Sequence, residues 1–369
     1  MEILNRHHIT PPRPPGAVYV GRGHPLGNPF VIGRDGNREA VIRLYRDHLE
    51  RAIAEKDPEI WSALRALDAQ SALVCSCAPA PCHAEVIDEL WQQHCAGLPP
   101  AVFVFGSNRA GRHGKGAALA ARDLFAAVPG AGEGPTGRAY AIPTKDAQLR
   151  TLPVPKILPA VRRFLRHAAG HPEIEFLVTA VGCGLAGYDA SWIAPLFAGA
   201  PDNCRFLEPQ FATLVPKPVQ ARRVIVAGSR SITERKTVWA ALDRLAKERW
   251  PGELFEVVCG EAPGADTLGR EWAQARGFPK HSLPAPWDTL DVPGAQVRVR
   301  CDGTQYNAAA GMARNAWMAA YGTHLVAFWD GRSPGTRGMI RLAEVCGLPV
   351  WQPAGDPTGI DPGAAQCRA

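Results

Sequence analysis

Short apolar runs that end in a glycine recur along the chain. The clearest read AVYVGR from Ala17, AVFVFGSN from Ala101 and VIVAGSR from Val224. An apolar run of this length that stops at a glycine is typical of a buried parallel strand, and the glycine permits a tight turn close to a ligand. We therefore predict strands whose carboxyl ends carry polar side chains, where open α/β sheets bind their ligands.

Segments with apolar residues at helical spacing follow these runs, and further short apolar runs lie between such segments. We predict helices over 38–49, 61–67, 84–93, 119–125, 191–197, 238–245, 267–276, 309–321 and 338–346, and further strands starting at 72, over 176–181, 256–259 and 325–329, and ending at 287. Alternating strands and helices indicate an α/β fold, with a Rossmann-like, doubly wound parallel sheet at the C-terminal end. The length and the Pro-rich linkers predict three domains, 1–98, 99–215 and 216–369.

Composition narrows the class of protein. The 369 residues are 46% hydrophobic, but no apolar run approaches the ~20 residues of a membrane span and no apolar signal segment opens the chain, so we expect a cytoplasmic protein without a membrane partner. Ten cysteines in a chain of this length do not form a small secreted disulfide pattern. The net charge of +6 suits phosphate-bearing ligands, whereas the absence of a long Lys/Arg run does not favour nucleic acid. A homo-oligomer remains open.

The predicted N-terminal domain holds two groups of polar side chains with binding chemistry. The Gly/Pro-rich loop after the first strand presents Arg22, His24 and Asn28, which we predict to face an anion such as a nucleotide phosphate. The second group follows the strand that starts at residue 72 and consists of Cys75, Cys77, Cys82 and His83.

Three interpretations of this Cys/His group stay open. All four residues are of types that bind zinc, although a strand continuing from Cys75 through Cys77 would place these two thiols on opposite faces. Cys82 stands at a predicted helix start, where the helix dipole lowers a thiol pKa and favours anions, so it is a candidate catalytic nucleophile. The third interpretation is a cluster of buried structural thiols.

The motifs V-x-V-G-R, L-G-N-P-F and C-x-C-A-P-x-P-C-H, which start at Val18, Leu26 and Cys75, resemble a family of uncharacterised bacterial and phage domains. The resemblance covers most of residues 17–95. It supports the boundary of the first domain more than any function.

Two Gly-rich loops, each at the end of a predicted strand, mark the middle domain. Backbone N–H groups of such loops and helix N-termini form phosphate cradles, and two loops can hold one pyrophosphate. The loops resemble those of the macrodomain fold, which binds ADP-ribose, and a phage-associated branch with F-G-S-N, G-R-H-G-x-G-A, A-I-P-T-K-D and G-C-G-L-A-G blocks. The resemblance implies a binding set of Gly106, Ser107, Asn108, Gly114, Gly116, Gly182, Gly184, Leu185 and Gly187. The Ala141–Asp146 block offers a cation and a carboxylate or forms a solvated turn, and His113 is a titratable base or a loop histidine.

The C-terminal blocks V-A-G-S-R, G-x-A-x-G-A-D, A-x-W, R-N and W-D-G-x-S-x-G-T occur in order over residues 223–351. They resemble the SLOG superfamily of Rossmann-like nucleotide-binding domains, which includes the LOG phosphoribohydrolases and the DNA-uptake protein DprA. The resemblance implies a phosphate over Gly335-Thr336 and a binding set of Gly228, Ser229, Arg230, Gly264, Asp266, Arg314, Asn315, Gly331, Ser333, Gly335 and Thr336.

LOG enzymes carry a glutamate at the position of Met339, and a thioether cannot do acid/base work. Asp266 and Glu261 are the candidate catalytic substitutes, and the alternative for Asp266 is a carboxylate that caps the following helix.

Together these features predict binding of a nucleotide-derived metabolite, such as ADP-ribose, an NAD derivative or a nucleoside phosphate. The favoured reaction, if the protein is an enzyme, is N-glycosidic or phosphoribosyl hydrolysis. One alternative is a non-catalytic sensor or sponge of nucleotide signals in phage–host conflict, and another is DprA-like DNA binding. Zinc at the Cys/His group is the cofactor that the sequence suggests.

Overall fold

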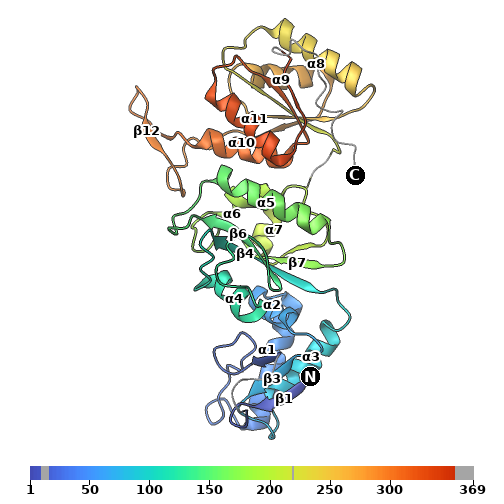
Figure 1. Cartoon of the computed structure of the whole chain (residues 1–369), viewed down its shortest axis with the longest axis vertical. Coiled ribbons are helices and arrows are strands. Elements are labelled where there is room, and N and C mark those ends of the chain that lie inside the picture. Colours follow the sequence, from blue (N-terminus) through green and yellow to red (C-terminus); the bar gives the residue numbers. More distant parts are fainter. Residues whose placement is uncertain (10–15, 218–219, 354–369) are drawn as a thin grey trace.

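A computed structural model describes residues 1–9, 16–217 and 220–353. Three sheets follow one another along the long axis of the molecule, and we refer to them as the N-terminal, middle and C-terminal parts (Figure 1). Their strands are almost all parallel and alternate with helices, which confirms the predicted α/β class. None of the helices in the described ranges combines the length and apolar character that crossing a membrane requires.

The N-terminal part is a small parallel sheet covered by helices. Its strands β1 (Glu2–Asn5), β2 (Ala17–Tyr19) and β3 (Ala72–Cys75) pair in the order β1-β3-β2, and its helices are α1 (Arg38–Glu55), α2 (Pro58–Ala66) and α3 (His83–His94). Helix α1 starts at Asn37, whose side chain accepts a hydrogen bond from the Ala40 N–H. This N-cap satisfies one of the helix's free donors and fixes where the helix starts.

The middle part is a five-stranded sheet in the order β5-β6-β4-β7-β8. The strands are β4 (Ala101–Asn108), β5 (Gly134–Thr136), β6 (Ala139–Lys145), β7 (Glu175–Val178) and β8 (Cys204–Phe206), and the helices are α4 (Gly116–Phe125), α5 (Val154–Ala169), α6 (Ala190–Ile193), the 3₁₀ helix η1 (Ala194–Phe197) and α7 (Pro209–Leu214). Within the Ala141–Asp146 block, Ala141 and Ile142 are fully buried in β6. Asp146 follows the strand and accepts from the exposed N–H groups of Gln148 and Arg150, so the solvated-turn interpretation holds for this carboxylate.

The C-terminal part is a five-stranded parallel sheet in the order β11-β10-β9-β14-β15. The strands are β9 (Arg223–Gly228), β10 (Glu256–Cys259), β11 (Lys280–Ser282), β14 (His324–Phe328) and β15 (Val350–Trp351), and the helices are α8 (Arg235–Arg249), α9 (Ala265–Arg276), α10 (Ala310–Tyr321) and α11 (Pro334–Cys346). A short hairpin, β12 (Val297–Val299) and β13 (Gln305–Asn307), projects from it.

Both faces of this last sheet are covered. Val224 and Val226 of β9 belong to the apolar cluster beneath α8 and α9, whereas Ile225 and Ala227 belong to the cluster that contains α10 and α11. Because successive side chains of a strand point to opposite faces, an uninterrupted apolar strand packs helices on both sides. This is the doubly wound, Rossmann-like arrangement that the sequence predicted.

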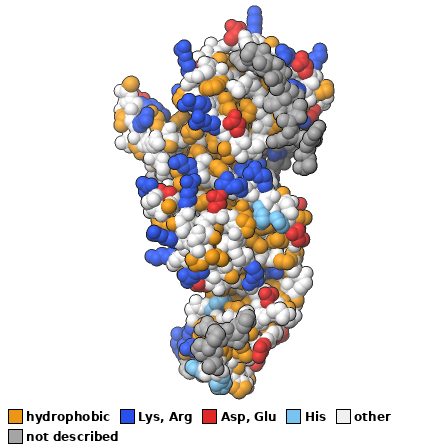
Figure 2. Space-filling model, viewed as in Figure 1, with side chains coloured by type: hydrophobic (Ala, Val, Ile, Leu, Met, Phe, Trp, Pro, Cys, Tyr) orange, Lys and Arg blue, Asp and Glu red, His pale blue; other side chains and the backbone are white. Residues whose placement is uncertain are grey.

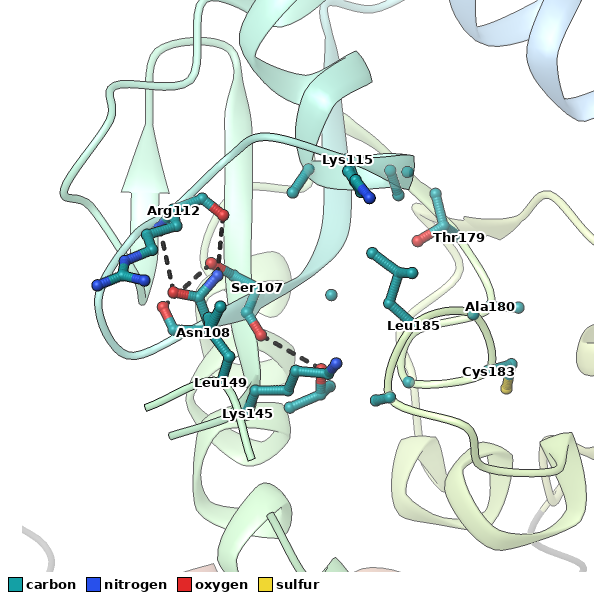
Figure 3. Close-up of a pocket in the computed structure, with 18 of the residues that line it drawn as sticks. Ser107, Asn108, Arg112, Lys115, Lys145, Leu149, Thr179, Ala180, Cys183 and Leu185 are labelled. Carbon is teal, nitrogen blue, oxygen red and sulfur yellow. Dashed lines mark hydrogen bonds between the residues drawn. The ribbon is translucent and has the colours of Figure 1, made fainter. Parts of the chain in front are cut away.

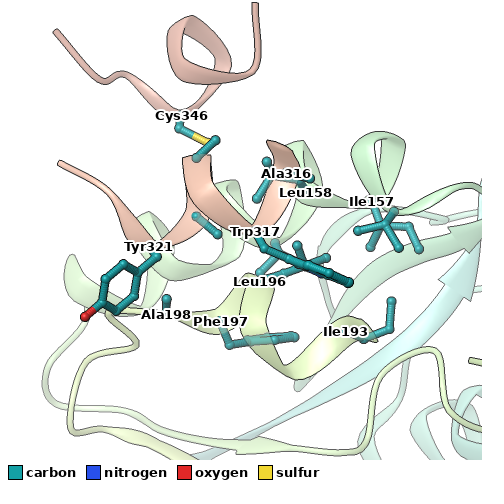
Figure 4. Close-up of a cluster of buried hydrophobic side chains, with 14 of the residues drawn as sticks. Ile157, Leu158, Ile193, Leu196, Phe197, Ala198, Ala316, Trp317, Tyr321 and Cys346 are labelled. Carbon is teal, nitrogen blue, oxygen red and sulfur yellow. The ribbon is translucent and has the colours of Figure 1, made fainter. Parts of the chain in front are cut away.

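Hydrophobic clusters cross from one part to the next. Helix α10 packs against α5 and η1 of the middle part (Figure 4). The Trp317 indole N–H donates to the Trp192 carbonyl at 2.9 Å. At the other end, Arg65 of α2 pairs with Glu175 of β7 at 3.0 Å. The predicted boundaries at 98 and 215 fall in the connections between α3 and β4 and between α7 and β9.

Candidate ligand-binding sites

A crevice of about 550 Å³ opens at the carboxyl ends of β9 and β14. Gly228 closes its floor, since a Cβ there would lie 2.3 Å from the Phe328 carbonyl oxygen and 2.6 Å from the Ala265 Cβ. Only glycine permits this close approach of the two strands and α9. The predicted binding residues that line the crevice are Gly228, Arg230, Asp266, Arg314, Asn315, Ser333, Gly335 and Thr336.

The N-terminus of α11 opens into this crevice. Ser333 is its N-cap and accepts a hydrogen bond from the Thr336 N–H, while Gly335 and Thr336 form the first turn. Pro334 has no N–H and the Thr336 N–H is bonded to Ser333, so the Gly335 N–H and the helix dipole are what this turn offers to an anion. Asp330 fixes the preceding loop by accepting from the N–H of Ser333 at 2.8 Å. This hydrogen bond and those from the Ser231 hydroxyl and the Arg332 N–H lower the pKa of its carboxyl group.

Three predicted residues shape the crevice without lining it. Ser229 is buried, with its Oγ 3.4 Å from the Thr336 Oγ1, so it ties β9 to α11. Gly264 has a φ of +90° and a Cβ there would lie 2.6 Å from the Ser229 carbonyl oxygen. Gly331 also has a positive φ, +76°, which suits the turn after β14.

Asp266 and Arg314 form a buried pair beside the crevice. The Asp266 carboxylate accepts from the Gly228 N–H at 3.0 Å and lies 3.8 Å from the Arg314 guanidinium. Burial raises the pKa of Asp266, and the Arg314 charge opposes that rise. The alternative that Asp266 caps helix α9 is wrong, because Gly264 occupies the N-cap.

Arg314 is committed to protein acceptors as well. Its guanidinium donates to the Gly260 carbonyl and, at 2.9 Å, to the Asn315 side chain, whose amide donates to the Gly335 carbonyl at 3.2 Å. Burial lowers the pKa of Arg314. Arg314 and Asn315 therefore hold β10, α10 and the first turn of α11 in place, which leaves the exposed Arg230 as the more available cation.

A second cavity of about 800 Å³ adjoins the crevice and shares Arg230, Trp287 and Arg314 with it. Glu261 lines this second cavity and not the first, and its carboxylate accepts from the Ser282 hydroxyl at 2.5 Å and pairs with Arg270 at 3.2 Å. The two candidate acids therefore lie on different sides of Arg314. Sequence reasoning did not assign a role to Trp287, although the A-x-W motif was the available signal.

The middle part holds a cavity of about 820 Å³ between its two Gly-rich loops (Figure 3). Asn108 holds the first loop through two hydrogen bonds to the backbone of Arg112, at 2.9 and 3.1 Å. Leu185, with 65% of its surface exposed, projects from the second loop into the cavity. Residues of the predicted set that line it are Gly106, Ser107, Asn108, Gly114, Gly116, Gly182, Gly184 and Leu185.

Other residues of the middle cavity differ from expectation. Gly187 does not line it; its φ is +79° and a Cβ there would contact Pro293 at 3.7 Å. His113 is buried beside Phe105, and burial lowers its pKa. Lys145, the cation that the Ala141–Asp146 block offers, lines the cavity, and so does Lys115, which sequence reasoning did not single out. Burial raises the pKa of Glu208, the acid in the lining.

The thiols of Cys75, Cys77 and Cys82 lie within 4.8 Å of one another. Opposite faces for Cys75 and Cys77 would require the strand to continue through both, but β3 ends at Cys75 and the chain turns there. The Cys77 N–H donates to the Cys75 sulfur at 3.3 Å, and the Ala84 N–H donates to the Cys82 sulfur at 3.4 Å. The three thiols thus form a cluster suited to a metal ion.

His83 lies beside the thiol cluster, and the environment of the cluster changes the pKa of Cys82. The His83 Nε2 lies 2.7 Å from the Val20 carbonyl, and its Nδ1 lies 3.6 Å from the Cys82 sulfur. Burial and the hydrogen bond with Cys75 raise the pKa of Cys82, so the expected lowering by the helix dipole is wrong. A buried neutral thiol is a poor nucleophile.

Two regions of the chain, one in the N-terminal part and one in the C-terminal part, match known protein families. Residues 4–93 match the Domain of unknown function DUF4326, and residues 222–289 match the YspA, cpYpsA-related SLOG family. The gene 61 protein of Mycobacterium phage D29 is 37% identical over 134 residues, which are 35% of this chain and 94% of the phage protein.

Among solved structures, DNA processing protein A (DprA) from Streptococcus pneumoniae is similar over 37% of this chain, with 19% identity and a TM-score of 0.27. The chain spans about half, 52%, of the length of that protein. The two family matches and the phage relative confirm the predicted SLOG-related C-terminal part, the N-terminal family and the phage association. The chain belongs to the family of the phage gene 61 protein.

Proposed function

We propose that the protein binds a nucleotide-type ligand in the C-terminal crevice, with its phosphate over Gly335 and Thr336. The observation that carries this proposal is the opening of the α11 N-terminus into a cavity that also presents Arg230 and Trp287. The helix and the arginine attract the phosphate, and the indole offers a flat apolar face to the sugar or base. The relationship to a SLOG family supports nucleotide-related binding.

Gly335→Asp tests the phosphate position. A Cβ at Gly335 meets only the Ser333 Oγ at 3.9 Å, so the variant should fold. Its carboxylate should repel the phosphate, so calorimetry with AMP, ADP-ribose and NAD should show the loss of the binding that belongs to the crevice. Arg337→Gln is the matched control, because it changes the net charge by the same amount on an exposed position of α11 outside the cavity. Unaltered binding by the variant would refute the site.

Asp266 is our proposed acid for N-glycosidic cleavage, since it lines the crevice with a raised pKa. A nucleotide panel separates the candidate functions: an enzyme releases free base, and Asp266→Asn slows that release while Glu261→Gln does not. A sensor or sponge binds the ligand and returns it intact. DNA binding would show a steep loss of oligonucleotide affinity with salt.

We also propose that the middle part, as a macrodomain-like module over residues 99–215, binds ADP-ribose. The supporting observation is the pair of Gly-rich loops facing each other across one cavity. Gly184→Val should place a side chain in the cavity and block the ligand. Since a Cβ at Gly184 meets nothing within 4 Å, the fold of the protein itself should be unaffected. Gly170→Ala at the end of α5 is the control outside the cavity. The measurement is calorimetry of ADP-ribose binding to the full chain with Gly335→Asp. Heat of ADP-ribose binding that Gly184→Val leaves unchanged would contradict this proposal.

The thiol cluster is our proposed zinc site. The His83 Nε2–H would donate to the Val20 carbonyl and leave Nδ1 to act as a fourth ligand beside the three thiols. Such a second hydrogen bond is the usual way to orient a histidine ligand. Metal analysis should find about one zinc per chain, lost in Cys77→Ser and kept in the exposed control Cys301→Ser. A metal content near zero in the parent protein would leave structural thiols.

A further inference from the structure

The N-terminal motifs that the sequence shows far apart meet around one cavity of about 500 Å³. The turn at Gly21-Arg22, the loop carrying Asn28 and Phe30, and the Cys77–His83 segment all line it. Neither the crevice nor the middle cavity uses these residues. Their convergence marks a separate site in the part of the chain that matches a domain of unknown function.

The loop that forms one wall is held firmly in place. Leu26 is fully buried and its carbonyl accepts from the Tyr45 hydroxyl at 2.8 Å. A Cβ at Gly27 would lie 2.4 Å from the Gly21 carbonyl oxygen, so the two ends of the loop approach closely only with glycine. Asn28 accepts from the Phe30 N–H at 2.8 Å, which shapes the loop from within.

The cavity is cationic. Arg6, Arg22 and Arg38 line it, and the described residues of its lining include no acidic side chain. Within the described part of the chain, none of the three forms an ion pair with a carboxylate within 4.0 Å, whereas the nearby Arg34 and Arg46 pair with Asp35 and Glu89. Three arginines without acidic partners around one hollow create a positive potential that an anion would neutralise.

The hydrogen bonds of these arginines leave donors for a ligand. Arg6 Nη1 donates to the Tyr19 hydroxyl at 3.1 Å, and Arg38 Nη1 donates to the Pro81 carbonyl at 3.3 Å. A guanidinium has five N–H donors in a fork that matches a phosphate, so one neutral acceptor does not satisfy it. The N-terminus of the 12-residue helix α3 lies at the same cavity through His83 and adds its dipole.

We propose that this cavity is a third ligand site, which binds the phosphate group of a nucleoside monophosphate through Arg22 and Arg38. Tyr19 and Phe30 supply aromatic faces for the base or sugar, and the hollow exceeds what inorganic phosphate fills. The site does not depend on the C-terminal crevice.

The test uses the full chain with Gly335→Asp and Gly184→Val, which removes the other two proposed sites. Calorimetry with AMP and with inorganic phosphate should show saturable binding that weakens at least tenfold in Arg22→Gln and in Arg38→Gln. Arg43→Gln is the matched control, because Arg43 is exposed on α1 and does not line the cavity. Two separate arginine variants guard against a folding defect in one of them.

The outcomes separate the proposals. Tighter binding of AMP than of phosphate supports the nucleotide, and equal affinities that still depend on both arginines identify free phosphate as the ligand of the same anion site. Absence of binding, or binding that Arg22→Gln and Arg38→Gln leave unchanged, overturns the inference. If Gly335→Asp alone leaves nucleotide binding untouched while the two arginine variants abolish it, the crevice proposal fails and this one stands.

Discussion

The imidazole of His324 is held in its neutral form by its neighbours. Arg222 donates to Nε2 at 2.8 Å, so Nε2 must carry a lone pair, and Nδ1 lies 2.9 Å from the Thr323 hydroxyl oxygen. Burial, and after it the Arg222 charge, lowers the pKa of His324 from 6.5 to about 4. Protonation would place an N–H at Nε2 that faces the Arg222 guanidinium, at the start of β14.

Stability should therefore fall in mild acid. Because the pKa of His324 is lower in the folded than in the unfolded chain, its contribution is present above pH 6.5 and is lost as the pH falls towards 4. We expect a loss on the order of 1–2 kcal/mol, allowing for solvent screening of a partly exposed ring. Urea unfolding at pH 7 and pH 4.5 should show a smaller loss in His324→Gln than in the parent.

The variant keeps the contribution of His24, whose pKa burial also lowers to about 4. Some acid sensitivity should therefore remain in His324→Gln, and it serves as an internal reference. An unchanged difference between the two pH values in the variant would show that His324 does not titrate as inferred.

Residue roles were the hardest feature to predict from sequence. The R-N and G-A-D motifs predicted that Arg314 and Asp266 lie near one ligand. They did not predict that the two side chains lie 3.8 Å apart and are largely committed to protein partners. The pKa of Cys82 rises because burial outweighs the helix start that the sequence made visible. Desolvation depends on tertiary packing, and motif spacing carries no information on it.

Elements with strong local patterns were predicted well. Strand β10 has the predicted bounds, Glu256–Cys259, and α9 and α10 differ from prediction by a few residues at most. Their apolar spacing and flanking glycines suffice because helices and buried strands are determined largely by that pattern. Turns at Gly228 and Gly182 followed from the same local chemistry.

Elements that depend on distant partners or carry conflicting residues were missed. Strand β1 is four residues long and exists through pairing with β3, near residue 72. Helix α5 contains Pro159 in its interior, and proline there normally argues against a helix. Burial of its apolar face, including Ile157, Val161 and Phe164, overrides that local penalty.

At the scale of the molecule, Lys and Arg side chains are scattered over the face visible in Figure 2 rather than gathered into one stripe. A single basic stripe would be the electrostatic footprint of nucleic acid. The cations that carry our proposals lie instead in separate cavities of the three parts. This distribution agrees with our proposal that each part of the chain binds a small anionic ligand.

The parts are nevertheless joined by packing. Trp317 of α10 lies 5.3 Å from Trp192, ring centre to ring centre, and is 9% exposed. Arg162 of α5 donates to the Ala320 carbonyl at 3.4 Å, and the Tyr188 hydroxyl lies 3.1 Å from the Pro293 carbonyl. The face of α10 that carries Arg314 serves the crevice, so the same helix connects the crevice to the middle part.

Trp317→Ala should therefore loosen the two parts from each other. We expect a cost of about 3–5 kcal/mol, as for other buried Trp truncations, and a thermal unfolding that changes from one joint transition of the middle and C-terminal parts to two. Trp239→Ala is the control: Trp239 lies on α8, on the opposite side of the C-terminal sheet, so its loss should lower the stability of that part. Calorimetry should then show the control shifted but not split, since α10 still buries Trp317 against α5 and η1. A Trp317 variant that unfolds in one transition, only at lower temperature, would mean that the remaining contacts of α10 hold the two parts together without this side chain.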